Sequence, residues 1–521
     1  MRGETSDSAV GWAALLGGAV TGRWYQHLPP GLLRAMSFAE SKSAMSTRRH
    51  QLRALMGAGL TTSAVAALAL AGPPAVSAAG DAAGDSLLPR PVPAERALDL
   101  LDGSETATVA ARADWSVPRL VEESTDRTLW VDTTGRLFYV DPAASDRSAQ
   151  RAPVTRQQIV PSARTFELHS RPNADRTIYL DFTGHIVTGT AWNTLVGTDP
   201  QTYGAYDSDG DPNSFNAAEK AEIQRTWRRV AEDYKPFDVD VTTAEPAPGR
   251  LARTNGADQV YGTRLLVTKG GDVFTLFCGS ACGGVAYVDV FDAVGAVHDD
   301  HQPGFVFTDG VGFGAKNIAE AASHEVGHNL SLSHDGTSVQ SYYAGHGARA
   351  PIMGVGYDRP VSQWSRGEYA DANNSQDDLA LISANGAPTR ADDHGDSIGS
   401  ATVTTGNRGK AVIESTGDQD VFRIKSTGGS YTVTAKPAGL GANLDIALRL
   451  MRPGGSLVAQ ADPAVGTVNA ETATGLAASV TRNLPAGNYF AQIRGAGFGS
   501  PATTGYSAYG SLGAFSVRAV H

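Results

Sequence analysis

Three histidines and one glutamate lie within the short segment HEVGHNLSLSH, which begins at His324 and ends at His334. Residues 317–330, which contain most of this segment, have the pattern of a helix. In a helix, His324 and His328 lie one turn apart on the same face, so both imidazoles can reach one ion. Glu325 is turned by about 100° from them. The pattern predicts a metal-bearing helix, after which the chain turns so that His334 supplies a third nitrogen.

This cluster is typical of a zinc ion that takes part in catalysis. Three neutral imidazole nitrogens leave a fourth position at zinc for water. Glu325 would act as the general base for a zinc-activated water that hydrolyses an amide bond. Asp335 is expected either to hold the loop or to orient a histidine, unless it is a simple turn residue. The competing interpretations are a polar helix end without metal and an inactive protein that still binds zinc.

The composition is that of a soluble protein with several domains. Of the 521 residues, 41% are hydrophobic and 19% are charged, which suits two or three globular domains. The formal net charge is -11, and no basic cluster follows the N-terminal region. Nucleic acid is therefore excluded as a partner.

Residues 1–79 are predicted to be an N-terminal extension with an export signal, and Met45 is the expected start. Arg48 and Arg49 precede a largely apolar stretch over residues 54–71, which is followed by small residues. This order is that of a signal removed during export by the Sec or twin-arginine route. We expect a secreted, extracellular protein without stable membrane insertion after cleavage. A membrane anchor is the alternative, but the apolar stretch is rich in Ala and Gly.

Residues 80–163 are predicted to be a propeptide. They are rich in Pro, Ala, Asp and Arg, and they contain one strand-like run over residues 128–141, with a turn at Thr134 and Gly135. An extended linker is the alternative interpretation. Because residues 80–277 contain no cysteine, we expect the latency of a precursor not to depend on a propeptide thiol.

Residues 164–387 alternate between strand and helix patterns and predict an α/β domain. Helical periodicity places apolar residues on one face of a helix over residues 216–234, with Asn216 and Glu219 spaced as a capping box. We expect a mixed twisted sheet with two main helices, of which the metal-bearing helix is the last. Branched and aromatic residues favour strands in residues 176–182, 237–243, 264–268, 283–290 and 304–309.

From residue 388 the pattern changes to short alternating runs separated by Gly and Pro. No helical stretch of more than a few residues interrupts these runs. They predict a separate all-β sandwich over residues 388–521, with a hinge at residues 392–397.

Cys278 and Cys282 are the two cysteines of the chain and fit a disulfide bond in an exported protein. Half of a metal site is the alternative, but no second cysteine pair exists to complete it. His298 and His301 flank two aspartates and allow a second metal site, although a polar surface loop is the preferred interpretation.

A second acidic segment resembles a calcium loop in part. Asp207, Asp209, Asp211 and Asn213 alternate in the manner of calcium ligands. The glycine of the segment is misplaced for an EF-hand, and the twelfth position is Ala218. Calcium here therefore competes with the interpretation as a solvated turn.

The segment HEVGHNLSLSH is similar to the metzincin zinc signature HExxHxxGxxH. Further on, APIMGVGY resembles the Met-turn that lies under the zinc in that clan, with Met353 as its methionine. The resemblance implies the metzincin fold, with zinc bound by His324, His328 and His334. Residues 283–290 fall where these enzymes have the edge strand that pairs with an extended substrate.

Two positions depart from the metzincin pattern. The glycine after the helix is replaced by Ser331, and because this turn needs a positive φ, we predict a left-handed conformation there despite the Cβ atom. Some metzincins carry a tyrosine two residues past the methionine as an extra zinc ligand, but Val355 occupies that position. Tyr357 is expected only to form a wall of the site or to assist the oxyanion.

A closer resemblance covers about residues 164–521. TIYLDFTGH, RVAEDYKPFDVDVTT, AEAASHEVGHNLSLSHDG, APIMGVGY and QWSRGEYADANNSQDDLALI resemble secreted bacterial reprolysin-like metallopeptidases, and DDHGDS, GDQDVFRI and LPAGNYFAQIRG resemble a pre-peptidase C-terminal domain. The resemblance implies a monomeric zinc endopeptidase that is made as a zymogen and acts on proteins or peptides. The alternatives are an exported adhesin or surface-binding protein with a structural zinc, and a zinc hydrolase of a non-protein amide.

Overall fold

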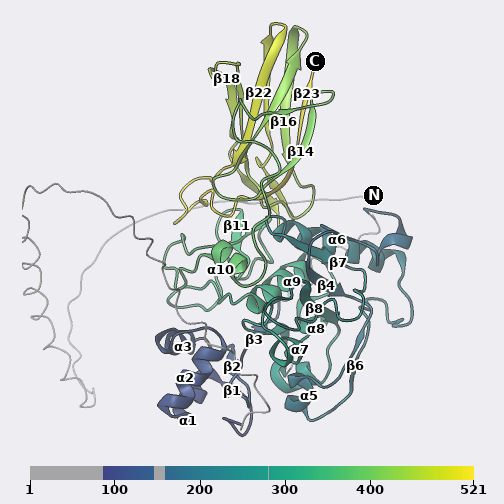
Figure 1. Ribbon diagram of the computed structural model, residues 1–521, viewed down its shortest axis with the longest axis vertical. Helices are drawn as coiled ribbons and strands as arrows, with labels where there is room; N and C mark the ends of the chain where they lie inside the picture. The colour runs from purple at the N-terminus through teal and green to yellow at the C-terminus, as the bar shows by residue number, and fades with distance from the viewer. Residues whose placement is uncertain (1–85, 146–158, 280) are drawn as a thin grey trace, which may run out of the picture. The chain divides into compact units, whose positions relative to one another are not determined.

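The computed structural model describes residues 86–145, 159–279 and 281–521. The predicted export signal, the expected start at Met45 and parts of the predicted propeptide lie outside the described residues. Along the described chain, a small region of helices and strands is followed by an α/β region and then by a region of strands (Figure 1). Among the described helices, none is both long and apolar enough to span a membrane.

Residues 86–145 fold around a small apolar core, to which Val288 of the α/β region also contributes. Three short helices and a β-hairpin enclose this core. The alternative interpretation of these residues as an extended linker is therefore wrong. Asp102 caps the second helix and forms a capping box with Glu105. The hairpin predicted in residues 128–141 is confirmed, but the helices were not predicted. The bounds are β1 Val92–Pro93, α1 Ala94–Leu100, α2 Gly103–Arg112, α3 Val117–Glu123, β2 Leu129–Val131 and β3 Leu137–Pro142.

An eight-stranded mixed sheet joins this first region to the α/β region, with the strand order β1-β2-β3-β9-β10-β8-β4-β7. Strands β10, β8, β4 and β7 are parallel neighbours, whereas β9 is antiparallel to both β10 and β3. All five strands predicted in this region are confirmed. Their bounds are β4 Arg176–Asp181, β7 Val239–Thr242, β8 Tyr261–Thr268, β9 Cys282–Tyr287 and β10 Gly304–Phe307.

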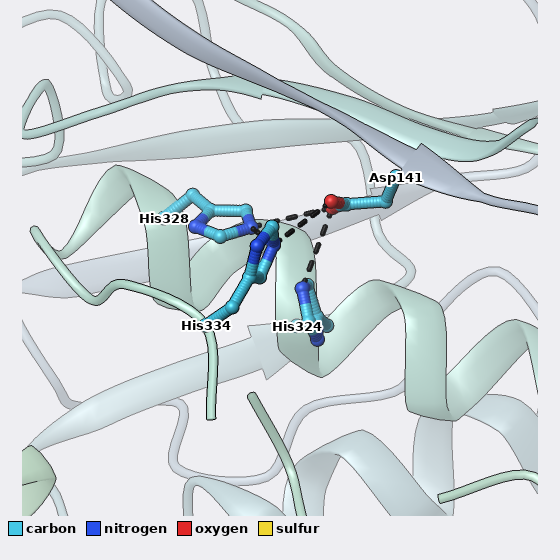
Figure 2. Close-up of side chains that lie close together, drawn as sticks. All are labelled: Asp141, His324, His328 and His334. Carbon is cyan, nitrogen blue, oxygen red and sulfur yellow. Dashed lines mark hydrogen bonds and ion pairs between the residues drawn. The ribbon is translucent and has the colours of Figure 1, made fainter. Parts of the chain in front are cut away.

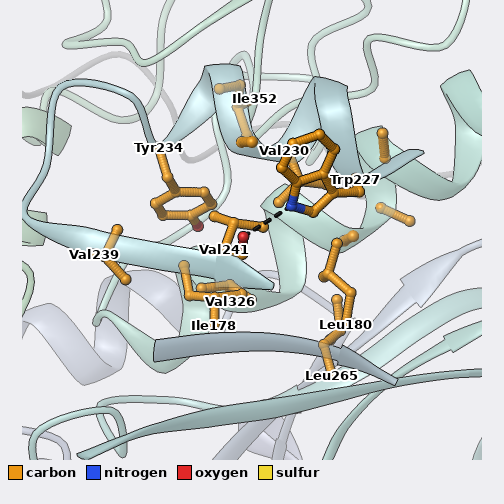
Figure 3. Packing of buried hydrophobic residues seen from close by; sticks show 14 of the residues in the cluster. Ile178, Leu180, Trp227, Val230, Tyr234, Val239, Val241, Leu265, Val326 and Ile352 are labelled. Carbon is orange, nitrogen blue, oxygen red and sulfur yellow. Dashed lines mark hydrogen bonds between the residues drawn. The ribbon is translucent and has the colours of Figure 1, made fainter. Parts of the chain in front are cut away.

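Two long helices, α6 and α9, pack against each other and against the sheet. Asn216 and Glu219 form the predicted capping box at the start of α6. Trp227 of α6 donates its indole N–H to the carbonyl of Val241 in β7 at 2.8 Å, within a core of aliphatic and aromatic side chains (Figure 3). These contacts fix α9 over the sheet. The bounds are α6 Ala217–Asp233 and α9 Ala315–Asn329.

A second apolar core involves the alternate side chains of β9 and β10. Trp192 packs edge-on against Phe305 of β10 and donates its indole N–H to the carbonyl of Pro303 at 2.9 Å. Cys278 and Cys282 are joined by a disulfide at the start of β9, with their Cα atoms 5.1 Å apart. The other elements are a 3₁₀ turn Ser162–Arg164, β5 His185–Val187, α5 Ala191–Val196, β6 Gln201–Tyr203, a π turn Phe274–Cys278, α7 Ala296–Asp299, α8 Thr308–Val311, β11 Arg349–Pro351, β12 Val361–Gln363 and α10 Asp378–Ala384.

The C-terminal region consists of two main sheets that share one apolar core, as predicted for a sandwich. One sheet has the strand order β13-β15-β22-β17-β18, and the other has the order β14-β23-β16-β21. The strands β19 and β20 form a separate pair. The bounds are β13 Thr402–Val403, β14 Arg408–Ile413, β15 Gln419–Ser426, β16 Gly429–Pro437, β17 Ile446–Met451, β18 Leu457–Ala461, β19 Gly466–Asn469, β20 Thr472–Thr474, β21 Ala478–Leu484, β22 Gly487–Gly495 and β23 Gly513–Val520.

Candidate metal centre

The predicted metal-bearing helix is α9, and both of its ends are held by neighbouring segments. At its start, the N–H of Ala315 donates to Glu222 of α6 at 2.8 Å. At its end, the carbonyl of His328 accepts the N–H of Asp289, which follows β9, at 3.1 Å. His324 and His328 lie one turn apart on this helix, and both are buried. The helix therefore presents the two rings at fixed positions.

The chain reverses at Ser331, whose φ of 71° lies in the left-handed region. The N–H of Leu332 donates to the carbonyl of Gly327 at 3.0 Å, and the N–H of Ser331 donates to the carbonyl of His328 at 2.9 Å. These two bonds form a Schellman motif. The positive φ predicted at Ser331 is confirmed, and the turn directs the chain so that His334 returns to the other histidines.

The Nε2 atoms of the three histidines converge on one point (Figure 2). Those of His328 and His334 are 3.1 Å apart. The Nδ1 atom of His324 is 2.8 Å from the carbonyl oxygen of Ile352, and that of His328 is 2.9 Å from the carbonyl oxygen of Leu332. Burial lowers the pKa of His324 to about 3 and also lowers the pKa of His328. Both rings are therefore neutral donors at neutral pH.

The fourth group at this point is the carboxylate of Asp141, which the sequence analysis does not assign to the site. Its Oδ2 atom lies 3.4 Å from Nε2 of His324 and 3.2 Å from Nε2 of His328. Its Oδ1 atom lies 2.9 Å from Nε2 of His334. Burial opposes ionisation, but the three histidines hold the pKa of Asp141 well below its usual range. Three imidazoles and one carboxylate thus share one small volume.

Glu325 lies beside this group of four donors. Its side chain is buried, with the residue 1% exposed, and its Oε2 atom has no hydrogen-bond partner among the described residues. A Cβ atom on Gly284 of β9 would lie 2.0 Å from Oε1 of Glu325, so the absence of a side chain there makes room for the carboxylate. Burial and the nearby charge of Asp141 raise the pKa of Glu325 well above its usual range. Its environment therefore favours holding a proton.

Met353 lies under α9, as expected of the Met-turn methionine. A Cβ atom on Gly327 would come within 2.5 Å of its Sδ atom, so the helix and the methionine are in close contact. The carbonyl of Met353 accepts the N–H of Asp335 at 2.8 Å. The side chain of Asp335 is 3.4 Å from the hydroxyl of Tyr369 and makes no hydrogen bond to a histidine among the described residues. Asp335 thus holds the loop, and its predicted alternative role of orienting a histidine is corrected.

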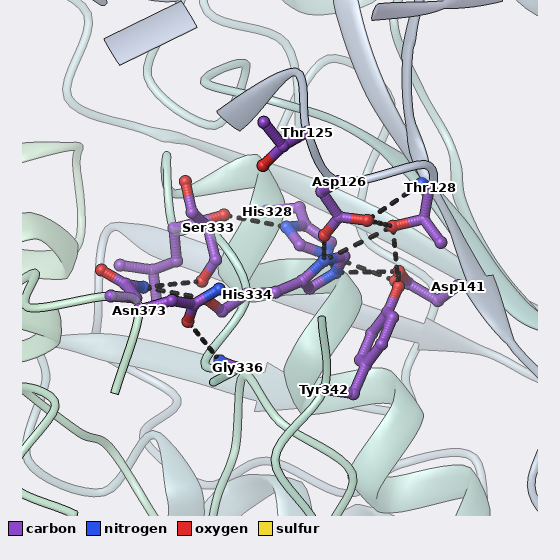
Figure 4. Close-up of polar contacts among 12 residues, drawn as sticks. Thr125, Asp126, Thr128, Asp141, His328, Ser333, His334, Gly336, Tyr342 and Asn373 are labelled. Carbon is purple, nitrogen blue, oxygen red and sulfur yellow. Dashed lines mark hydrogen bonds and ion pairs between the residues drawn. The ribbon is translucent and has the colours of Figure 1, made fainter. Parts of the chain in front are cut away.

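Asp126 and Tyr342, which were not predicted to belong to the site, also contact His334 (Figure 4). Asp126, which precedes β2, accepts a hydrogen bond from Nδ1 of His334 at 2.6 Å. Tyr342 packs against the His334 ring with centroids 4.2 Å apart and donates its hydroxyl to Oδ1 of Asp141 at 2.7 Å. Burial opposes it, but the charges of Asp126 and Asp141 raise the pKa of His334 to about 10.

A cavity of about 20 Å³ borders the centre, and its lining includes Asp141, Glu325, Tyr342 and Tyr357. A space of this size holds about one water molecule. Tyr357 forms part of its wall, which is one of the two roles expected for it. The centre is therefore closed to a peptide in this arrangement of the chain.

The predicted calcium loop is only partly assembled. Asp207 and Asp209 lie together with Glu219, whereas Asp211 is not part of this group of carboxylates. Asp207 accepts the N–H of Asp209, and Glu219 accepts the N–H of Asn216 in the capping box. These carboxylates serve turns of the backbone, and calcium binding here remains a prediction.

His298 is buried and His301 is half-buried, whereas Asp299 between them is exposed at the end of α7. The preferred interpretation as a polar surface loop therefore holds for Asp299 but not for His298. The ring of His298 contacts the carbonyl oxygens of Val290 and Leu251 at 2.9 and 2.6 Å. Burial lowers the pKa of His301 to about 4. Among the described residues, the segment forms no cluster of metal ligands.

The residues at the centre fit a zinc ion. Imidazole nitrogens and a carboxylate oxygen are zinc ligands, and the outer nitrogens of the three rings already face acceptors that fix the ring orientation. Nε2 of His324 and Oδ2 of Asp141 are buried without a hydrogen-bond partner among the described residues. Such atoms are rare in proteins unless a ligand or ion satisfies them. All four donor atoms lie within 4.8 Å of one another.

Part of the chain matches a known protein family. Residues 221–335, which include α6 and α9, match the family model described as Metallo-peptidase family M12B Reprolysin-like. The match is to metallopeptidases. It contains all three histidines and Glu325, and it ends directly after His334.

Comparison with individual proteins adds little about activity. No curated protein sequence matches the chain. The pre-peptidase C-terminal domain of collagenase from Bacillus anthracis is 10% identical, with a TM-score of 0.16, over 23% of this chain and 94% of that chain. The periplasmic inhibitor of g-type lysozyme, PliG, from Aeromonas hydrophila is 10% identical, with a TM-score of 0.15, over 23% of this chain and 93% of that chain.

Proposed function

We propose that this protein is a secreted zinc endopeptidase that is made as an inactive precursor. The observation that carries the proposal is the convergence of three histidine Nε2 atoms, with Glu325 buried beside them. The match of residues 221–335 to a metallopeptidase family supports it. Residues 1–79 would carry the export signal, and residues 80–163 would be the propeptide.

The catalytic groups follow from the geometry of the centre. His324, His328 and His334 would bind zinc through Nε2, because their Nδ1 atoms face other acceptors. When bound, zinc supplies Lewis acidity that polarises the scissile carbonyl and lowers the pKa of water. Glu325 accepts the proton of the attacking water and returns it to the leaving amine nitrogen. Burial makes its carboxylate a stronger base, which suits this exchange.

Strand β9 supports binding of an extended peptide. It is antiparallel to β3, and without β3 it would be the edge of the sheet. An exposed sheet edge can bind an extended chain through main-chain hydrogen bonds. A Cβ atom on Gly283 would lie 2.8 Å from the carbonyl oxygen of Pro142, so the absence of a side chain there lets another backbone approach β9 closely.

Replacing the proposed base tests this function. Glu325→Ala should retain zinc but lose nearly all hydrolysis of casein, because it removes the base without removing a ligand. Glu320→Gln is a matched control on the same helix, since Glu320 contacts Lys316 and Ser362 and no histidine. Zinc content and peptide release would be measured on chains from which residues 80–163 had been removed by proteolysis. Turnover by Glu325→Ala would refute the mechanism.

One observation favours a second candidate function. Four protein donors at one point form a closed set, and closed sets are typical of structural zinc. The chain would then be an exported adhesin or surface-binding protein. Zinc retention without hydrolysis of casein or small amides, before and after removal of residues 80–163, would support it. Hydrolysis of small amides alone would instead indicate a non-protein amide as the substrate.

A further inference from the structure

The first region places its hairpin on the edge of the α/β region. Strand β3 pairs antiparallel with β9, and Asp141 stands opposite Gly284. The register then shifts by one residue before Pro142. Because Gly284 also borders Glu325, this register brings Asp141 to the place where the base and the histidines meet.

The spacing around Asp141 is that of donors around one ion. Its oxygens lie 2.9 to 3.4 Å from the Nε2 atoms of His324, His328 and His334. Four donors about 2.0–2.2 Å from a tetrahedral zinc ion are about 3.4 Å apart. The Oδ2 atom of Asp141 is buried without a hydrogen-bond partner among the described residues, although Tyr342 satisfies Oδ1. The carboxylate thus presents Oδ2 to the Nε2 atoms of His324 and His328 at the centre.

Residues 86–145 also contact the histidine ligands and the turn after α9 through residues other than Asp141. Tyr139 stacks on the ring of His328, with centroids 4.2 Å apart and planes 23° apart. Asp126 binds Nδ1 of His334 (Figure 4). Arg119 of α3 donates to the carbonyl of Ser331 at 3.3 Å. Three contacts besides Asp141 therefore fix the position of residues 86–145 against the metal helix and its turn.

A carboxylate, not a thiolate, is the metal-binding group that residues 86–145 can supply. The chain has two cysteines, and these are joined to each other in a disulfide, so neither is a free thiolate. An ionised carboxylate is a zinc ligand and adds a negative charge where three imidazole nitrogens face a divalent cation.

We propose that Asp141 is a fourth zinc ligand, supplied by residues 80–163, that keeps the precursor inactive. In this position it takes the place that the attacking water needs beside Glu325, while β3 covers the edge of β9 where an extended peptide would pair. Activation then requires cleavage that releases Asp141 and β3 together. The inhibitory role rests on the proposed peptidase function, whereas the role as a ligand does not.

Metal binding by the uncleaved chain tests the ligand role without using activity. The full chain would carry Glu325→Gln to prevent self-cleavage. Adding Asp141→Asn should weaken retention of Zn²⁺ against a competing chelator by about tenfold or more and should change the visible absorption spectrum of bound Co²⁺. Asp132→Asn is the matched control. Asp132 accepts the N–H groups of Arg136 and Thr134 in the hairpin turn, and it makes no hydrogen bond to the three histidine ligands. The control variant should change neither readout.

A second experiment tests inhibition. With Glu325 intact, the uncleaved wild-type chain should not hydrolyse a casein peptide, whereas uncleaved Asp141→Ala should. Unchanged Zn²⁺ retention and Co²⁺ spectrum in both the Asn and Ala variants would overturn the proposal, whatever the activity of the cleaved enzyme. If Zn²⁺ binding weakens as expected but the cleaved wild-type chain hydrolyses no peptide, the peptidase function fails and Asp141 remains a ligand of a structural zinc.

Discussion

The orientation of the three histidine rings depends on acceptors from three separate segments. His324 faces the carbonyl of Ile352, and His328 faces the carbonyl of Leu332. Only His334 faces a side chain, that of Asp126. Because any residue can supply a main-chain carbonyl, no residue type marks the first two acceptors in the sequence. The ligands could therefore be predicted from their spacing, but the groups that orient them could not.

Ser331 is a strained position that glycine would relieve. Its φ of 71° places a Cβ atom in the left-handed region, where a residue other than glycine is strained by about 1–2 kcal/mol. The greater freedom of glycine in the unfolded chain offsets about 0.4–1 kcal/mol of this. Ser331→Gly should therefore increase the free energy of unfolding by about 0.5–1 kcal/mol and preserve zinc binding.

Denaturant unfolding of the two chains measures this difference. Ser333→Gly is the control, because Ser333 is buried two residues further on and its φ is not positive. That variant should lose stability, since glycine there relieves no strain. A Ser331→Gly chain that is clearly less stable than the wild type would contradict the role of strain at this turn.

The main helices and strands of the α/β region follow from local patterns. The capping box at Asn216 and the branched residues of the strands act over a few residues, so the sequence could predict them. The helices α1, α2 and α3 were missed because their composition resembles that of a linker. Asp141 stands at the end of a predicted strand, but its partner strand is distant in the sequence. Register between distant strands is not a local property, and Asp141 could not be assigned to the site.

Asp233, the last residue of α6, should make stability depend on pH. It accepts hydrogen bonds from Ser323 of α9 at 2.6 Å and from Asn443 at 2.8 Å. Burial, followed by the charge of Glu320, raises its pKa to about 8. The folded chain therefore keeps a proton that the unfolded chain releases near pH 4. The contribution of Asp233 to stability is greatest below about pH 4, and it decreases by up to about 1.4 kcal/mol per pH unit as the pH rises towards 8.

Asp233→Asn mimics the protonated carboxyl and should remove this contribution. The free energy of unfolding would be measured for both chains at several pH values between 5 and 8. The difference between the chains isolates Asp233 from other titrating groups. We expect the free energy of unfolding of the variant to increase relative to that of the wild type as the pH rises. Equal slopes would show that Asp233 ionises in the folded chain as it does in the unfolded chain.

The arrangement of the regions was predictable in outline, because the change from helical to alternating patterns near residue 388 is a feature of the sequence. The contacts that join the regions were not. Tyr509 lies between β22 and β23 of the C-terminal region, yet it packs into the core of the α/β region. Its hydroxyl donates to Asp377 at 2.6 Å and accepts the N–H of Leu379 at 2.9 Å. The predicted separate sandwich is therefore bound tightly to its neighbour.

Deleting residues 392–521 should separate stability from catalysis. The metal ligands and Glu325 all precede the deletion, and Arg390, which donates its N–H to the carbonyl of Pro236, is retained. Zinc content should stay the same, and hydrolysis of small unfolded substrates should persist after removal of residues 80–163. The loss of Tyr509 and its contacts should decrease the free energy of unfolding by about 2–4 kcal/mol.

Zinc analysis and thermal unfolding of the truncated chain measure the two effects independently. The full chain with Tyr509→Ala serves as the control, because it removes one side chain with its contacts and leaves both sheets of the C-terminal region in place. We expect its midpoint of unfolding to lie between those of the wild-type and truncated chains. A truncated chain that is folded but binds no zinc would mean that the C-terminal region positions the histidines. The buried hydrogen bond from Asn443 to Asp233 beneath α9 would be the first contact to examine in that case.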